Sequence, residues 1–519
     1  MQHEPAAQFR AHEVRSGSTL LARTIPSRWL IAGLLAYLSL GQLLLWRFLD
    51  MAPAAAFAVA APLVALVCWS ATRPQDERSS PDPRLAAFLI ALAASTALFL
   101  LGGEGRVFYS NIDWQVRDAV LRDMAVNPWS FAYEAGSELE VLRAPLGMYF
   151  VPALAWKAFG PVAGDWAMLV QNSVLLATLL TLASTLFSNM RERLTGLAVF
   201  ILFSGLDALG ALATGRWADH LDAWAGTEFS STITLAFWVP HHALAGWSGA
   251  LAFLLWSKGG QSIRFLVALP PLLALWSPFA LIGTLPFAGV AVAGAMHRKQ
   301  LHARDLLAPA LTLALAAPSL VYLSAASPSV GAGLSDLTVV QFLFFEAVET
   351  LPYLVPIALL AARCREHRAA LCVPALCLLV APWFRIGTSM DFAARATIPA
   401  LAILALLTAD ALARRRDGAP RGVRIWLCMA LGIGTITGAA EVTRAAVHRP
   451  APRQDCSFID AWNLSFGRFP KDAYLGRLND MPPLLRPTSP SAAKPSGPGP
   501  CSFDGWYRPL PPDFSKSRD

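Results

Sequence analysis

The stretch "WLIAGLLAYLSLGQLLLW", Trp29 to Trp46, decides the fold class because it contains no charged residue. A helix of about 20 predominantly apolar residues is long enough to cross the hydrocarbon core of a bilayer. A helix of this length on a water-soluble protein would instead show an apolar face and a polar face. The stretch is therefore predicted to be a transmembrane helix.

Similar apolar runs recur along the chain of 519 residues, which is 55% hydrophobic and only 15% charged. Soluble domains carry about a quarter charged residues. The clearest further runs are Leu85–Gly103, Trp166–Met190 and Leu306–Ala325. We predict an all-α polytopic membrane protein with about 13 transmembrane helices, within a range of roughly 11 to 14. Residues 145–160 are too short for an ordinary span and are expected to be re-entrant or interfacial.

Short basic loops indicate the orientation, because Lys and Arg accumulate in cytoplasmic loops. Such loops lie at 191–193, 257–264, 297–304, 363–368 and 414–424. They account for the net charge of +7 without a nucleic-acid partner, for which the sequence has no motif. The predicted divisions are a cytoplasmic segment (1–27), a transmembrane domain (28–446) with a large extracytoplasmic loop (104–145), and an extracytoplasmic tail (447–519).

The tail contains a stretch rich in Pro, Ser and Gly at 482–500, which predicts that part of it is disordered. Two cysteines lie in the tail, Cys456 in "DCSF" and Cys501 in "PCSF". Outside the cytoplasm a disulfide between them is chemically reasonable, and two free thiols are the alternative. No cysteine has the spacing of a metal ligand.

The first large loop is unusually rich in charge for this chain. Its stretch "SNIDWQVRDAVLRDM" predicts a helix with Ser110 as N-cap, an apolar stripe through Val116 and Val120, and an end at Asn127-Pro128. An amphipathic helix beside a membrane lies in the interface. At 100° per residue Asp113 faces the membrane surface, whereas Asp118 faces water.

Ion pairing gives these charges an explanation that needs no catalytic role. Asp113 and Arg117 are four residues apart, as are Asp118 and Arg122, so each pair can form on one face of the helix. Helix capping and surface ion pairs therefore remain open as a complete account of the segment.

The sequence from Asn111 to Gly160 resembles the GT-C superfamily of integral-membrane glycosyltransferases. In that family an early extracytoplasmic loop carries an acidic residue at the membrane surface. Juxtamembrane helices follow, and then a Pro-Leu-containing segment that ends in Phe-Gly, as at Phe159-Gly160 in "APLGMYFVPALAWKAFG". The stretch "RIGTSMDFAARATIPAL" (385–401) is similar to a late loop of related bacterial membrane proteins. One departure is that two spans precede the span leading into the acidic loop, where family members often have none.

The resemblance implies a hexosyl- or pentosyltransferase in a bacterial inner membrane. Its donor would be a polyprenyl-phosphate-linked sugar, its acceptor an envelope glycan, lipid or protein, and its surroundings membrane lipids; no cofactor and no metal are expected. The general base would be Asp113, whose position at the interface favours a raised pKa. The reserve acidic residues are Asp123, Glu138, Glu140 and Asp391.

A phosphate leaving group requires cationic or hydrogen-bonding partners. The candidates near extracytoplasmic span ends are Arg117, Arg143, His241, His242 and Arg395. Each has a structural alternative: an ion pair with Asp391 for Arg395, capping of the short apolar segment for Arg143, and polar residues beside interfacial tryptophans for the histidines. Asp219, His220 and His242 are residue types that could bind a metal, but no metal site is predicted there.

Two other functions remain open from the sequence. A transporter or lipid flippase would carry charges within its spans and internal repeats. No repeat is visible, and the acidic residues in apolar segments are Asp207, Glu346 and Glu349. A ligase or polymerase that joins whole lipid-linked glycans would share the substrates and the side of the membrane.

Overall fold

A computed structural model describes residues 20–51, 54–73, 82–136, 138–217, 220–325, 330–361, 365–387, 390–414, 419–467, 469–499 and 501. The fold in these residues is nearly all helix, in agreement with the prediction of a helical membrane protein. The α-helices are α1 (Ser27–Phe48), α2 (Ala54–Thr72), α3 (Leu85–Leu101), α4 (Asp113–Val126), α5 (Phe150–Phe159), α6 (Pro161–Ala183), α7 (Met190–Leu202), α8 (Asp207–Thr214), α9 (Thr232–Trp238), α10 (Pro240–Ser257), α11 (Ile263–Leu273), α12 (Pro278–His297), α13 (Leu307–Ser324), α14 (Val339–Glu349), α15 (Leu351–Ala361), α16 (Arg365–Val380), α17 (Asp391–Ala396), α18 (Ile398–Ala413), α19 (Arg421–Val447) and α20 (Phe458–Phe466).

Six helical segments of the described chain are long and apolar enough to cross a membrane, or seven if the bent pair α14 and α15 counts as one span. The six are Ser27–Phe48, Pro161–Leu186, Met190–Thr214, Pro278–His297, Ala303–Ser324 and Arg421–Val447. The predicted count of about 13 is not confirmed. Several other apolar segments, such as α3, α11 and α18, form helices of only 10 to 17 residues. These helices are shorter than the roughly 20 residues that a single helix needs to cross the bilayer.

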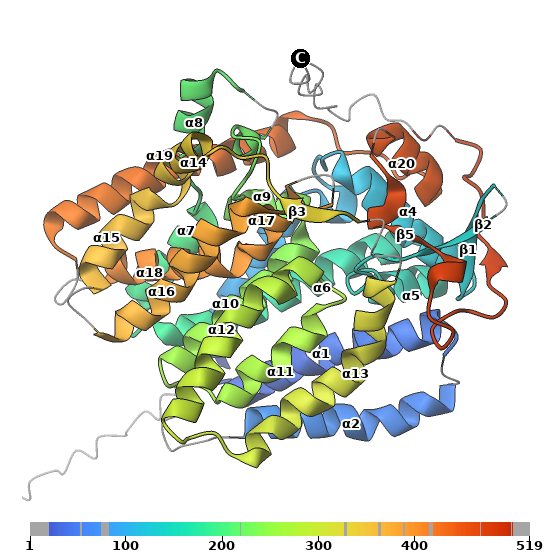
Figure 1. The fold of residues 1–519 in the computed structure, drawn as a ribbon, viewed down its shortest axis with the longest axis horizontal. Coiled ribbons are helices and arrows are strands. Elements are labelled where there is room, and N and C mark those ends of the chain that lie inside the picture. Colours follow the sequence, from blue (N-terminus) through green and yellow to red (C-terminus); the bar gives the residue numbers. More distant parts are fainter. Residues whose placement is uncertain are drawn as a thin grey trace, which may run out of the picture.

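Helix α10 lies at the centre of the bundle, where it contacts α6, α11, α12 and α18 (Figure 1). Sixteen of its 18 residues are buried, from Pro240 to Leu255. A helix that is apolar on all sides is stable only when other helices surround it. The first residues of α10 are therefore held at a fixed position in the fold.

A small sheet joins the first large loop to the tail, and the all-α prediction did not include it. Its order is β5-β2-β1-β6, with β1 (Phe131–Ala135) and β2 (Glu138–Leu142) from the loop and β5 (Leu475–Arg477) and β6 (Ser491–Ala492) from the tail. A second pair joins β3 (Ala332–Leu334) to β4 (Phe384–Ile386). These strands have only two to five residues, which is too short for a period-2 pattern to reveal.

The described part of the tail folds back onto the loop. Helix α20 packs on α4 at the edge of the molecule (Figure 1), and Cys456 is bonded to Cys501 with their Cα atoms 5.5 Å apart. Arg122 Nε donates to Asp455 Oδ1 at 2.6 Å, which adds a further link between loop and tail. Residues 500 and 502–519 lie outside the described part, as does most of the predicted cytoplasmic segment.

Candidate functional site

Helix α4 supplies the first two residues of the site. It ends at Val126, as Asn127-Pro128 predicts, but it begins at Asp113, so Ile112 takes the N-cap position predicted for Ser110 and makes no side-chain capping bond. Asn111 Oδ1 accepts the backbone N–H of Asp113 at 3.1 Å, so Asn111 takes the local role expected of Ser110. Eleven of the 14 helix residues are buried, because the tail covers the face expected to meet water.

Arg117 links Asp113 to the centre of the bundle. Its Nη2 donates to Asp113 Oδ2 at 2.9 Å, as the four-residue spacing predicts, and its Nη1 lies 3.2 Å from His241 Nδ1. The Arg117 side chain is 4% exposed, whereas that of Asp113 is 22% exposed. Arg117 Nε is buried without a hydrogen-bond partner in the described structure, so this guanidinium keeps a donor for a further group.

The two histidines lie at the first turn of α10, directly after Pro240. Their rings are stacked with centroids 4.0 Å apart, and His242 Nδ1 bonds Ser277 Oγ at 2.7 Å. The backbone N–H groups of a helix N-terminus carry partial positive charge and attract anions. Asp219 of the considered metal set lies outside the described residues, and the described residues contain no group of three or more metal-ligating side chains.

Arg395 approaches the same point from α17. It forms an ion pair with Asp391 one helical turn away, which is the structural alternative that the sequence left open. Its Nε has no hydrogen-bond partner in the described structure. Burial lowers the pKa of Arg395, but attraction from Asp391, Glu228 and Asp113 raises it more. Arg395 therefore lies within the electrostatic reach of Asp113 and stays charged.

Two tyrosines that the sequence did not single out complete this group. Burial lowers the pKa of Arg117, while electrostatic interactions with Tyr474, Asp113 and Tyr149 raise it more, so all three residues lie near the guanidinium. Tyr149 precedes α5 in the short apolar segment that the sequence did highlight. Tyr474 comes from the tail, and nothing in the local sequence indicates its place. We call the set of Asp113, Tyr149, Arg117, His241, His242, Asp391, Arg395 and Tyr474 the Asp113 cluster.

Arg143 lies outside the Asp113 cluster and fastens the loop to its neighbours. Its Nη1 donates to Leu323 O at 3.0 Å, its Nη2 donates to Asp472 O, and its backbone N–H donates to Tyr474 O at 2.6 Å. These contacts join the loop to α13 and to the tail. The geometry favours a structural role for Arg143, which differs from the predicted capping of residues 145–160.

The reserve acidic residues other than Asp391 also lie elsewhere. Asp123 is fully buried and accepts from Tyr133 Oη at 2.7 Å and from the Phe458 backbone N–H at 2.8 Å, so it holds the tail helix in place. Glu138 is exposed on β2 and pairs with Arg477 at 3.1 Å. Glu140 lies on the same strand.

Asp118 corrects a prediction, because it neither faces bulk water nor pairs with Arg122. Its Oδ2 lies 2.8 Å from Nη2 of Arg106, and its side chain is 21% exposed. With Glu104 and Asp165 it lines a cavity of about 20 Å³ on another side of Arg117. Burial raises the pKa of Asp118 to about 6 despite the attraction of Arg106. Arg106 was missed because its partners come from two different helices, α4 and α6.

A second acidic group is buried around α8, α14 and the residues before α9. Asp207 Oδ2 accepts from Ser204 at 2.6 Å, Glu349 Oε1 from Trp224 at 2.7 Å, and Asp222 Oδ2 from a backbone N–H at 2.9 Å. The other oxygen of each carboxyl group has no partner in the described structure. Among these, Asp207 and Glu349 are acidic residues that the sequence places in apolar segments.

The Asp113 cluster has the chemistry of an anion site beside a base. The buried guanidinium of Arg117, the half-buried guanidinium of Arg395 and a helix N-terminus attract an anion, and the partly exposed carboxylate of Asp113 can accept a proton. No family model, no curated protein and no solved structure matches the chain.

Proposed function

We propose that the chain is a membrane glycosyltransferase of the GT-C type that transfers a sugar from a polyprenyl-phosphate-linked donor to an acceptor hydroxyl. The acceptor is an envelope glycan, lipid or protein on the extracytoplasmic face of a bacterial inner membrane. Asp113 acts as general base, and Arg117, Arg395 and the first turn of α10 bind the donor phosphate.

The observation that carries this proposal is the position of Arg117. One guanidinium contacts both Asp113 and His241, at 2.9 Å and 3.2 Å, and still has an unpartnered Nε. A phosphate placed here lies next to the base that activates the attacking hydroxyl. This adjacency suits glycosyl transfer, in which the hydroxyl loses its proton as the phosphate leaves the sugar.

Asp113 fits the role of base better than Asp118 does. Asp118 pairs with Arg106 beside a small cavity, whereas Asp113 pairs with Arg117, which also contacts the α10 N-terminus through His241. A general base must be within hydrogen-bond reach of the proton that it removes. The anion and the acceptor therefore meet at Asp113.

The test replaces Asp113 with Asn and, separately, Asp118 with Asn, and measures sugar transfer from polyprenyl-phosphate-linked donors in purified membranes. Loss of a general base lowers the rate by about 10²- to 10⁴-fold, so Asp113→Asn is expected to show a loss of this size and Asp118→Asn a smaller one. Glu138→Gln is the matched control, because Glu138 is exposed on the same loop and lies outside the Asp113 cluster. Equal losses in both aspartate variants, or none in Asp113→Asn, contradict the assignment.

A transporter is the second candidate, and the buried carboxyl groups of Asp207, Asp222 and Glu349 favour it. Buried acidic residues in membrane proteins often mark ion or proton pathways. The two functions differ in what they require: transport needs a sealed vesicle with two compartments, while glycosyl transfer proceeds in detergent micelles. Sugar transfer by the micellar protein supports the transferase, and solute or lipid movement without transfer supports the transporter.

A further inference from the structure

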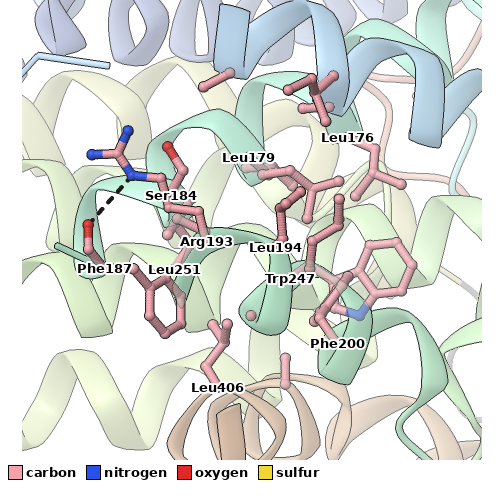
Figure 2. Close-up of a pocket in the computed structure, with 18 of the residues that line it drawn as sticks. Leu176, Leu179, Ser184, Phe187, Arg193, Leu194, Phe200, Trp247, Leu251 and Leu406 are labelled. Atoms are coloured by element: carbon pink, nitrogen blue, oxygen red, sulfur yellow. Dashed lines mark hydrogen bonds between the residues drawn. The ribbon is translucent and has the colours of Figure 1, made fainter. Parts of the chain in front are cut away.

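A cavity of about 70 Å³ lies between α3, α6, α7, α10 and α18, and none of the residues that line it belongs to the Asp113 cluster (Figure 2). Its walls are almost entirely apolar, with Leu176, Leu179 and Trp247 at one end. About 10–15 Å³ of such volume holds one water molecule, so the cavity has room for a short run of chain carbons. It is too small for a whole sugar or nucleotide.

The polar end of this cavity marks the membrane face opposite to the Asp113 cluster. Asp165 lies near the first residue of helix α6, beside Arg106 and Asp118. Ser184 directly follows the last residue of the same helix. Nineteen residues at 1.5 Å each separate these two positions, or roughly 28 Å. The hydrocarbon core is about 30 Å thick, so Ser184 and the neighbouring Arg193 lie at the far boundary.

Arg193 supplies the only charged side chain among the residues that line this cavity. Figure 2 shows its guanidinium at the edge of the cavity, where Nε donates to Phe187 O at 3.4 Å. That contact is long for a hydrogen bond, and no shorter hydrogen bond of the guanidinium is found among the described residues. The first turn of α7 is already capped, because Asn189 Oδ1 accepts the Glu192 N–H at 3.1 Å. Arg193 is therefore the group at this end of the cavity that can bind an anion.

The rim of the cavity opens toward lipid. Ile90 of α3 and Met190 and Leu194 of α7 line it and have exposed fractions of 40%, 46% and 48%. Exposed apolar side chains on a membrane-spanning bundle face acyl chains. A ligand therefore enters from the bilayer, not from water.

We propose that this cavity binds the upper part of one acyl chain of an anionic phospholipid, with its phosphate on Arg193. The charge of the polar end, its depth at the membrane boundary and the apolar rim all match this ligand. The lipid-linked sugar donor is a different molecule, because its phosphate site lies at the other end of α6.

The test uses the purified full-length chain in vesicles of phosphatidylethanolamine, phosphatidylglycerol and phosphatidylcholine, followed by native mass spectrometry of retained lipid. The chain is expected to retain phosphatidylglycerol in preference to phosphatidylcholine of the same acyl chains. Arg193→Gln should weaken retention about tenfold, the loss expected for one charge-assisted hydrogen bond. Ala87→Phe, which fills the rim from α3, should also reduce it.

Arg191→Gln is the matched control, since Arg191 is exposed two residues earlier on α7 and does not line the cavity. Arg193→Lys, which keeps a positive charge, should retain most of the binding. The proposal is overturned if Arg193→Gln and Arg191→Gln behave alike, if phosphatidylcholine binds as well as phosphatidylglycerol, or if a polyprenyl phosphate is the retained lipid. Circular dichroism of each purified variant shows whether it is folded, so that a loss of lipid binding can be distinguished from a loss of folding.

Discussion

At the scale of single residues, the Asp113 cluster shows how far local spacing predicts contacts. The pairs Asp113–Arg117 and Asp391–Arg395 follow from positions four apart on a helix. Asp118 has the same spacing to Arg122 but pairs with Arg106. Arg106 reaches it because the chain turns sharply at residues 103–106, where Gly103 has φ 95° and a Cβ would meet Ser110 Cβ at 2.5 Å.

Asp118 should make stability depend on pH. Its pKa is raised from 3.8 to about 6 in the folded chain, so folding favours the protonated carboxyl group. The resulting stabilisation is complete below about pH 4 and is lost as the pH rises through about 6. The melting temperature of the native chain, relative to that of Asp118→Asn, should therefore fall between about pH 4 and pH 7. Thermal unfolding in detergent measures this difference.

The control for this prediction is Asp50→Asn, because Asp50 is 60% exposed in its pair with Arg47. Any pH dependence that both variants share does not come from the Asp118 carboxyl group. A difference for Asp118→Asn that does not change with pH would show that Asp118 has the same pKa in the folded and unfolded chain. Arg106, Asp165 and Arg453 are the charged groups whose own changes must be compared.

At the scale of elements, the end of α4 was predictable and its surroundings were not. Asn127-Pro128 stops the helix through a local rule that acts on the backbone. The cover over α4 comes from α20 and from the strands β5 and β6, which lie more than 300 residues further along, as the 333-residue separation of Arg122 and Asp455 illustrates. Pairing of such short strands depends on contacts that no local pattern records. Tyr474 could therefore not be assigned to the site from the sequence.

The disulfide between Cys456 and Cys501 should stabilise this cover. It closes a loop with a sequence separation of 45, for which chain entropy predicts at most about 4 kcal/mol. Replacing both cysteines with Ser should therefore speed proteolysis of the tail and expose α4. Limited proteolysis with mass mapping measures the cleavage rate.

The exposed free thiol of Cys428 provides the comparison, and Cys428→Ser should leave that rate unchanged. Reducing agent should reproduce the effect of the double variant on the native chain. Cleavage of the tail at the same rate with and without the disulfide would mean that the hydrogen bonds of Arg122 and Asp123 are sufficient to keep the tail on α4.

At the scale of the whole molecule, apolar runs predicted the helical class correctly, whereas the predicted number of crossings is not confirmed. Composition reports how much apolar surface a helix has, but α10 is apolar because other helices surround it. Helices α14 and α15 form a pair bent by 67°, so two apolar segments there can amount to one crossing. Length and packing decide which runs span the bilayer, and both depend on the folded state.

The fold predicts which ends of the chain share a side of the membrane. The tail lies with α4, while the turn after α12 lies about 30 Å away along that 20-residue helix. A disulfide in the tail requires an oxidising compartment. Alkaline phosphatase fused after residue 519 should therefore be active, and the same enzyme inserted after residue 299 should be inactive. The reverse pattern would place the Asp113 cluster on the cytoplasmic side of the membrane, where it could not bind a donor on the extracytoplasmic side.

The sheet that joins loop and tail also sets an order of events during biosynthesis. Strands β1 and β2 leave the ribosome early, yet each borders a strand from the last part of the chain. A nascent chain that stops before residue 475 lacks β5, β6 and the cysteine at 501, and Tyr474 cannot be held beside Arg117. The Asp113 cluster is thus assembled only on chains that have been synthesised almost to their end, so that incomplete products carry Asp113 without the surroundings that the proposed reaction requires.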